Sequence, residues 1–152
     1  MRYMPIIRAV TALLPVGEDI VKARGGSEPY NILPNRLYVW PRRPVYNSVD
    51  EDALEQGRVE ELTVRVRILY VLGSKGEPNA LDTDDELSDA LDAAAEELVA
   101  ALAAHRQHPL WIDLYIEGVL PDVIRNEQAR GIGIDVWVRP AATDEIEGGD
   151  GS

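Results

Sequence analysis

The stretch Leu81–Gln107 constrains the fold most, because its apolar residues recur with the period of an α-helix. Spacings of three and four place these residues on one stripe: Leu87, Leu91, Ala94, Ala95, Leu98, Leu102 and His105. Thr83 and Glu86 fit a capping box, and acidic residues in the first turn suit the positive end of the helix dipole. About 23 helical residues span roughly 35 Å. A helix of this length with a single apolar stripe requires a sheet on which to pack.

Strand-forming residues that alternate in polarity lie on both sides of this helix. Four such segments are predicted to be strands: Arg36–Trp40, Val59–Leu72, Leu110–Glu117 and Gly131–Arg139. An amphipathic pattern over residues 3–14 predicts a first helix, whereas Glu18–Arg24 fits either an extended or a short helical segment. The polar and proline-containing Pro41–Gly57 and the segment Gly118–Arg130 are interpreted as connections.

The resulting prediction is an α+β fold in one domain over residues 1–140. A four-stranded, mainly antiparallel sheet packs one face on two helices, in the order helix, strand, strand, helix, strand, strand. Residues 141–152 are acidic and contain three glycines, so they are expected to form a disordered tail that is dispensable for folding.

Composition and charge narrow the class of protein. The chain has 152 residues, a formal net charge of −12 and no Cys, which excludes disulfides and thiolate chemistry. An acidic surface repels nucleic acid, so no specific DNA binding is expected. No apolar run approaches the roughly 18 residues of a membrane helix, and the N-terminus lacks the form of a signal peptide. We therefore expect a soluble protein, without a membrane partner, in a reducing compartment.

The sequence gives little support to an enzyme. His105 and His108 are the only histidines; they are interpreted as complementing the end of the long helix, because no third metal ligand is evident nearby. The pair Gly131 and Gly133 lies inside a predicted strand, where glycine marks a bulge or a close approach. We expect no catalytic residues, no metal site and no cofactor.

The clearest indication of function in the sequence is the face of the predicted sheet that is turned away from the helices. Strand alternation places Trp, Tyr and Arg side chains there, accompanied by Asp113 and Asp135. The candidate contact residues are Tyr38, Trp40, Arg65, Arg67, Trp111, Tyr115, Trp137 and Arg139. Trp, Tyr and Arg together are typical of protein–protein hot spots. There are two alternatives to a protein–protein contact. The aromatic rings could form only cross-strand pairs on a face exposed to solvent, or Glu18–Pro34 could fold over them.

The order of these elements resembles that of a known protein family. The short first helix, the strands RLYVWP (36–41) and ELTVRVRILYV (61–71), the acid-capped alanine-rich helix and the strand GIGIDVWV (131–138) resemble the tail terminator proteins of long-tailed bacteriophages. The similarity extends over about residues 3–140 and is one of element order and pattern.

The resemblance implies a structural virion protein that forms a hexameric ring on the finished tail tube. The ring stops tube polymerisation and offers a docking surface to the head completion (connector) protein, while DNA passes through its lumen without specific binding. It implies assembly in the bacterial host cytoplasm, a place in the neck of the virion, and contacts through Pro41–Gly57 and Gly118–Arg130. The alternatives are another neck or tail-completion protein, a small cytosolic ligand-binding or enzymatic domain, or a regulatory interaction module.

Overall fold

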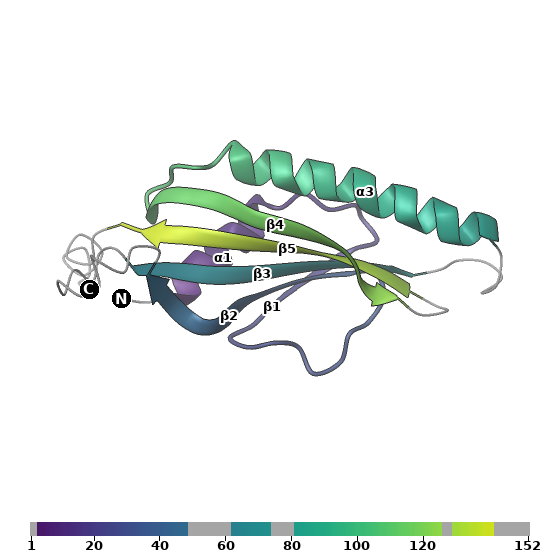
Figure 1. Cartoon of the computed structure of the whole chain (residues 1–152), viewed down its shortest axis with the longest axis horizontal. Coiled ribbons are helices and arrows are strands. Elements are labelled where there is room, and N and C mark those ends of the chain that lie inside the picture. Colours follow the sequence, from purple (N-terminus) through teal and green to yellow (C-terminus); the bar gives the residue numbers. More distant parts are fainter. Residues whose placement is uncertain (1–2, 49–61, 74–80, 126–128, 142–152) are drawn as a thin grey trace.

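A computed structural model describes residues 3–48, 62–73, 81–125 and 129–141. In these ranges two helices and five strands follow one another along the chain (Figure 1). The elements are α1 Met4–Leu13, β1 Val21–Arg24, β2 Arg36–Ser48, β3 Leu62–Gly73, α3 Leu81–Ala103, β4 Trp111–Arg125 and β5 Ala129–Pro140. The α+β class and the two helices are as predicted.

The described strands form one sheet with the order β1-β2-β3-β5-β4. The pairs β2–β3, β3–β5 and β4–β5 are antiparallel, whereas β1 runs parallel to β2. The prediction of four strands was therefore wrong by one. Val21–Arg24, which the sequence left open between strand and helix, pairs with residues 36–39 of β2 and forms an edge strand.

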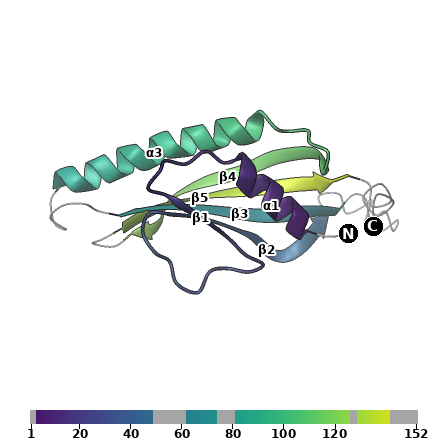
Figure 2. The same ribbon diagram turned by 180° about the vertical axis from the view of Figure 1, so that it is seen from behind.

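The two helices pack on the same face of the sheet and enclose the main core. Figure 2 shows α1 in front of this face and α3 along one side of it. The stripe of α3 is buried at Leu91, Leu98 and Leu102, as expected. Alternate residues of two central strands meet it: Val64, Val66, Ile68 and Tyr70 from β3, and Ile132, Ile134, Val136 and Val138 from β5. Period-two alternation therefore predicted the inner faces of these two strands correctly.

The long helix α3 begins at Leu81, so Thr83 lies within its first turn and not at the predicted cap position. The side chains of residues 81–85 are outside the described set, and so is the predicted capping box. The tail 142–152 is also outside it. Ala141, which was assigned to that tail, is buried, and its amide donates to the carbonyl of Leu110 at 3.0 Å.

Two segments interpreted as connections are strands instead. β2 continues past Trp40 to Ser48, with a break in register between Pro41 and Tyr46 where the Arg43–Pro44 peptide bond is cis. Prolines are tolerated here because the pairing with β1 ends at Val39, and beyond that point no strand among the described residues lies on this side of β2 to accept its amides. Residues 49–57 of that predicted connection lie outside the described part of the chain.

The other misassigned segment is Gly118–Arg130, most of which belongs to β4 and β5. The register shifts three times along β4, and the largest shift sets Leu120 against Gly133 but Ile124 against Gly131. A Cβ on Gly131 would lie 3.0 Å from Cβ of Ile124, and one on Gly133 would lie 3.1 Å from Cγ2 of Val123. The glycine pair thus serves a close approach beside a bulge, one of the two interpretations given above.

Candidate functional site

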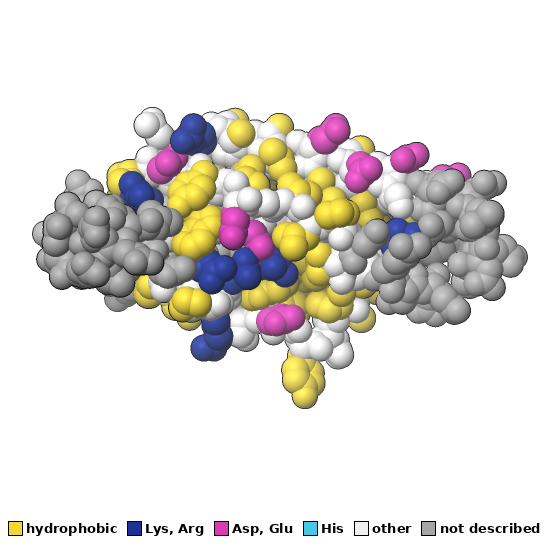
Figure 3. Space-filling view, viewed as in Figure 1, with side chains coloured by type: hydrophobic (Ala, Val, Ile, Leu, Met, Phe, Trp, Pro, Cys, Tyr) yellow, Lys and Arg dark blue, Asp and Glu magenta, His cyan; other side chains and the backbone are white. Residues whose placement is uncertain are grey.

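The sheet face opposite the helices is the candidate functional site. In Figure 1 this face is turned to the viewer and no helix crosses it. The register aligns its side chains in rows across β2, β3, β5 and β4. One row joins Trp40, Arg67 and Asp135, and the next joins Arg65, Trp137 and Tyr115. Figure 3 shows Lys and Arg side chains gathered over the centre of this face.

One end of the face is covered, which corrects the expectation for Tyr38 and Trp40. Both side chains are only 6% exposed and belong to a second apolar cluster with Leu69 and Val71. The segment between β1 and β2 provides the cover: Ile32 packs on this cluster, and the Tyr38 hydroxyl accepts a 2.7 Å bond from the amide of Leu33. The alternative in which part of Glu18–Pro34 folds over the face therefore holds at this end.

Trp111 does not lie on this face at all. It is 1% exposed and packs in the main core, whereas its neighbour Ile112, which uninterrupted strand alternation would turn toward the helices, is 56% exposed. The cause is a break in the register of β4 and β5 between Trp111 and Asp113, which shifts the alternation by one residue. The indole Nε1 donates to the carbonyl of His105 at 3.0 Å, and the ring stacks on His108 at 4.1 Å.

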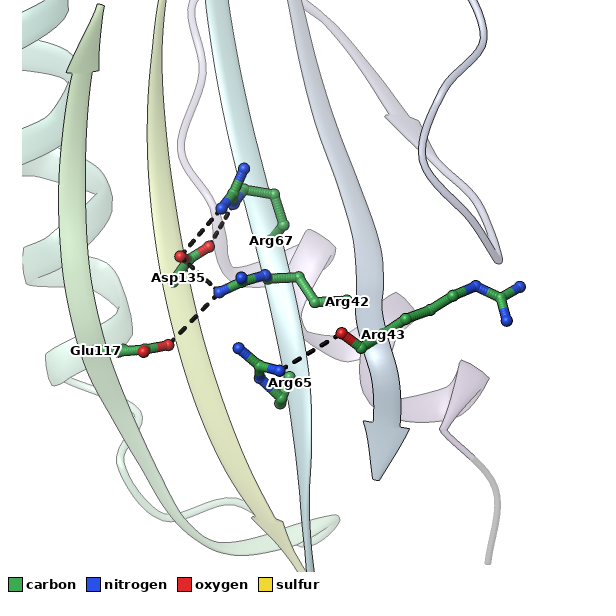
Figure 4. A network of polar contacts seen from close by, with 6 residues as sticks. All are labelled: Arg42, Arg43, Arg65, Arg67, Glu117 and Asp135. Atoms are coloured by element: carbon green, nitrogen blue, oxygen red, sulfur yellow. Dashed lines mark hydrogen bonds and ion pairs between the residues drawn. The ribbon is translucent and has the colours of Figure 1, made fainter. Parts of the chain in front are cut away.

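An ion-pair network occupies the centre of the open face (Figure 4). Asp135 is buried, and its carboxylate accepts from two guanidinium groups. Arg67 donates through Nε to one carboxylate oxygen and through Nη2 to the other at 3.1 Å, which Arg42 Nη1 also approaches at 2.7 Å. Arg42 Nη1 lies 3.6 Å from a carboxylate oxygen of Glu117 as well. The network therefore joins four strands, since its residues come from β2, β3, β5 and β4.

Next to the network lies a row of an arginine and two aromatic rings. Arg65 Cζ is 5.0 Å from the centroid of the Trp137 ring, a cation–π distance. Trp137 and Tyr115 lie parallel, with centroids 6.4 Å apart and an interplanar angle of 5°. All three side chains are half-buried. Burial, opposed by Arg139 and reinforced by Asp113 and Glu117, raises the pKa of Tyr115.

Positive charge on this face exceeds the negative charge available to pair with it. Among the described residues, neither Arg43 nor Arg65 has a carboxylate within ion-pair distance. The Nε atoms of Arg65 and Arg139 are buried and have no hydrogen-bond partner in the same part of the chain. Figure 4 shows the Arg43 side chain extending away from the network. A hollow of about 370 Å³ beside it is lined by Glu28, Trp40, Pro41, Arg42, Arg43 and Arg67.

The structure thus brings together five of the predicted contact residues: Arg65, Arg67, Tyr115, Trp137 and Arg139. Arg42 is not among the predicted contact residues, because it lies between two prolines in a segment interpreted as a connection. A signal was nevertheless present, since continuing the alternation of Tyr38 and Trp40 by two residues places Arg42 on the same face. Alternation from Asp113 and Tyr115 likewise places Glu117 on this face.

The histidines occupy the turn after α3. His105 Nδ1 lies 2.9 Å from the carbonyl of Ala101, and His108 Nδ1 accepts from the amide of Leu110 at 3.0 Å. Burial, and secondarily the neighbouring His105, lowers the pKa of His108. Within residues 3–48, 62–73, 81–125 and 129–141, no group of three or more potential ligands could hold a metal ion.

A second hollow, of about 530 Å³, lies between the start of α3 and the segment before β1. Its described lining includes Glu18, Asp19 and Glu86 beside Ile20 and Leu87. This set of side chains includes carboxylates and apolar groups but no histidine, serine or lysine.

Comparison with models of protein families gives no match, and comparison with curated proteins gives none either. A search of the described helices finds none with the length and apolar character needed to cross a membrane.

Proposed function

We propose that this chain is a structural protein of a long-tailed bacteriophage that closes the end of the tail tube as a ring. The proposal rests on the order of elements that carries the resemblance to tail terminator proteins. It is further supported by a sheet face that leaves Trp137, Tyr115 and several arginines without a covering helix (Figure 1). Trp, Tyr and Arg with partly exposed surface are the residues that dominate protein–protein contacts.

In this proposal the ring stops tube polymerisation by covering the last ring of tube protein. Its other rim is the docking surface for the head completion protein, and six copies form the ring. DNA passes through the lumen without specific binding, because a chain of net charge −12 does not hold phosphates. The protein assembles in the host cytoplasm and remains in the neck of the virion. The role requires no catalytic step and no cofactor.

The contact surface assigned to this function is smaller than the sequence suggested. Tyr38, Trp40 and Trp111 are buried within the chain and therefore have almost no surface to offer a partner. The remaining contact residues are Arg65, Arg67, Tyr115, Trp137 and Arg139, to which the network adds Arg42. The described part of β4 contributes exposed apolar residues beside them: Leu120 and Val123, which lie against Gly133.

Tail assembly tests the proposal directly. The tube protein of the phage that encodes the chain is allowed to polymerise with and without the chain, and tube lengths are measured by negative-stain electron microscopy. We expect tubes of uniform length that bear a ring at one end and join heads when the chain is present. Tubes that grow to the same unlimited length in its presence would contradict the proposal. A chain that binds heads but leaves tube growth unchecked would be another neck protein.

A further inference from the structure

The exposed side of α3 is a ridge of negative charge. Every charged residue in this helix is acidic. Asp89, Asp92 and Glu96 recur at spacings of three and four, so their side chains follow one line along the helix, and all three are exposed. None of them is paired with a basic group in the described part of the chain. In Figure 3 acidic side chains follow the edge of the molecule that α3 forms.

The arginine-rich face carries the complementary charge in a different part of the molecule. Asp135 and Glu117 engage Arg42 and Arg67, but Arg43 and Arg65 remain without a carboxylate among the described residues. A guanidinium group has five N–H donors, and Arg42 uses only Nη1 in the network. The hollow of about 370 Å³ is lined by the three arginines Arg42, Arg43 and Arg67 and by one acidic residue, Glu28. Its described lining is therefore net positive, and it offers a concave place for an acidic side chain.

We propose that the arginine-rich face of one copy binds the acidic α3 ridge of a second copy. This inference deepens the proposed function and rests on it, since it names the contact between neighbouring subunits of the ring. The two surfaces are different patches of one chain, so each copy offers one and receives the other. Such a heterologous, head-to-tail contact builds rings or filaments and not a closed two-fold dimer.

Charge complementarity favours a second copy over nucleic acid as the occupant. Duplex DNA approaching the arginines would also meet Asp135, Glu117 and a chain of net charge −12. The α3 ridge offers carboxylates spaced along a helix, and arginine pairs with carboxylates through its planar fork of donors. Because these groups are partly solvated, the contact should weaken as salt screens them.

Charge reversal in each surface separately tests this pairing. Arg43→Glu changes an exposed side chain that forms no ion pair with the described residues, since Arg43 accepts from Arg65 through its backbone carbonyl only. Asp92→Arg with Glu96→Arg reverses the charge of the ridge. Either variant alone should weaken self-association, measured by sedimentation at low salt, by about tenfold or more. An equimolar mixture of the two variants should restore association, because the reversed face of one matches the reversed ridge of the other. Arg8→Glu on α1 and Glu18→Arg, with charge changes of the same sign at exposed sites, should leave it unchanged.

Disulfide trapping covers the case in which free copies associate too weakly for sedimentation. The chain has no Cys, so Arg43→Cys and Asp92→Cys introduce the only thiols. Mild oxidation of their mixture should yield covalent dimers at least about tenfold faster than a mixture of Arg8→Cys with Asp92→Cys, as expected for a specific encounter. Equal rates, together with sedimentation that is insensitive to the reversals or shows only monomers, would overturn the proposal. Specific binding of duplex DNA to this face, lost in Arg43→Glu, would overturn it as well.

The tube assay separates failure of this contact from failure of the proposed function. If Arg43→Glu terminates tubes at the wild-type length, the contact is wrong and the function stands. If the reversed variants restore one another in sedimentation but wild-type chain leaves tubes to grow unchecked, the contact stands and the function is wrong.

Discussion

Replacing Trp111 by Ala should remove a large part of the free energy of unfolding of this chain, although strand alternation would place this residue on the surface. The indole is 1% exposed, stacks on His108 and donates to the carbonyl of His105. Truncation removes the ring from the main core and leaves a cavity at the junction of β4 with the end of α3. The change therefore tests whether the register break at the start of β4 sets the direction of this side chain.

The magnitude follows from area and one hydrogen bond. A buried Trp side chain removes about 200 Å² from water. At about 25 cal/mol per Å² this corresponds to about 5 kcal/mol, which a compact unfolded state reduces to about 3–4 kcal/mol. Loss of the Nε1 bond adds about 1 kcal/mol. The expected loss in the free energy of unfolding is therefore about 4–5 kcal/mol, in the range measured for Trp→Ala in cores.

Urea denaturation followed by far-UV circular dichroism measures this loss without relying on the fluorescence of the deleted indole. Trp111→Phe keeps a ring in the core but cannot donate the bond, so it should cost about 1–2 kcal/mol. Trp137→Ala on the open face should cost less than Trp111→Ala, because the Trp137 ring is only half-buried. A loss below about 1.5 kcal/mol for Trp111→Ala would refute the inward placement.

Three further changes probe other parts of the fold. Leu98→Ala, at a fully buried position of α3, should lower the free energy of unfolding by about 2–5 kcal/mol in urea titrations; a loss below about 0.5 kcal/mol would mean that another face of the helix is buried. Gly131→Ala should lower the melting temperature, because the new Cβ would lie 3.0 Å from Cβ of Ile124. Gly118→Ala should leave the melting temperature unchanged, because its Cβ would meet no atom within 4 Å, and equal shifts for the two variants would contradict the close approach. The lowered pKa of His108 means that the unfolded state gains the proton first, so stability should fall as pH drops below about 6.5, and His108→Gln should remove part of that fall in unfolding curves at pH 7.5 and 5.5.

Periodicity in the sequence was sufficient to predict the buried face wherever an element is regular over many residues. α3 shows the predicted stripe because each buried leucine reinforces the same face of a long helix. The inner faces of β3 and β5 followed from alternation, since both are central strands without a break in the register that joins them. These elements determine the α+β class and the position of the core.

Local breaks in register are what the sequence does not reveal. The shift between Trp111 and Asp113 inverts two side chains, and no residue type at that point is specific to a bulge. β2 was cut short at Pro41, because a proline is excluded from a central strand but permitted where the neighbouring strand has ended. The cover over Trp40 depends on where an irregular segment folds, which is decided by tertiary packing and not by local pattern.

The central pairing of β3 with β5 has a consequence for how the chain reaches this structure. It joins residues about 55–75 positions apart, whereas β2 meets β3, and β4 meets β5, across much shorter connections. Closing the longer loop costs about 1 kcal/mol more in chain entropy than closing the one between β2 and β3, and pairings of this kind form late in folding. The hydrogen bond from Arg67 to Asp135 joins these two strands. The charged surface is therefore completed only when the two halves of the chain have joined, so a partly folded subunit does not present the face proposed to bind its neighbour.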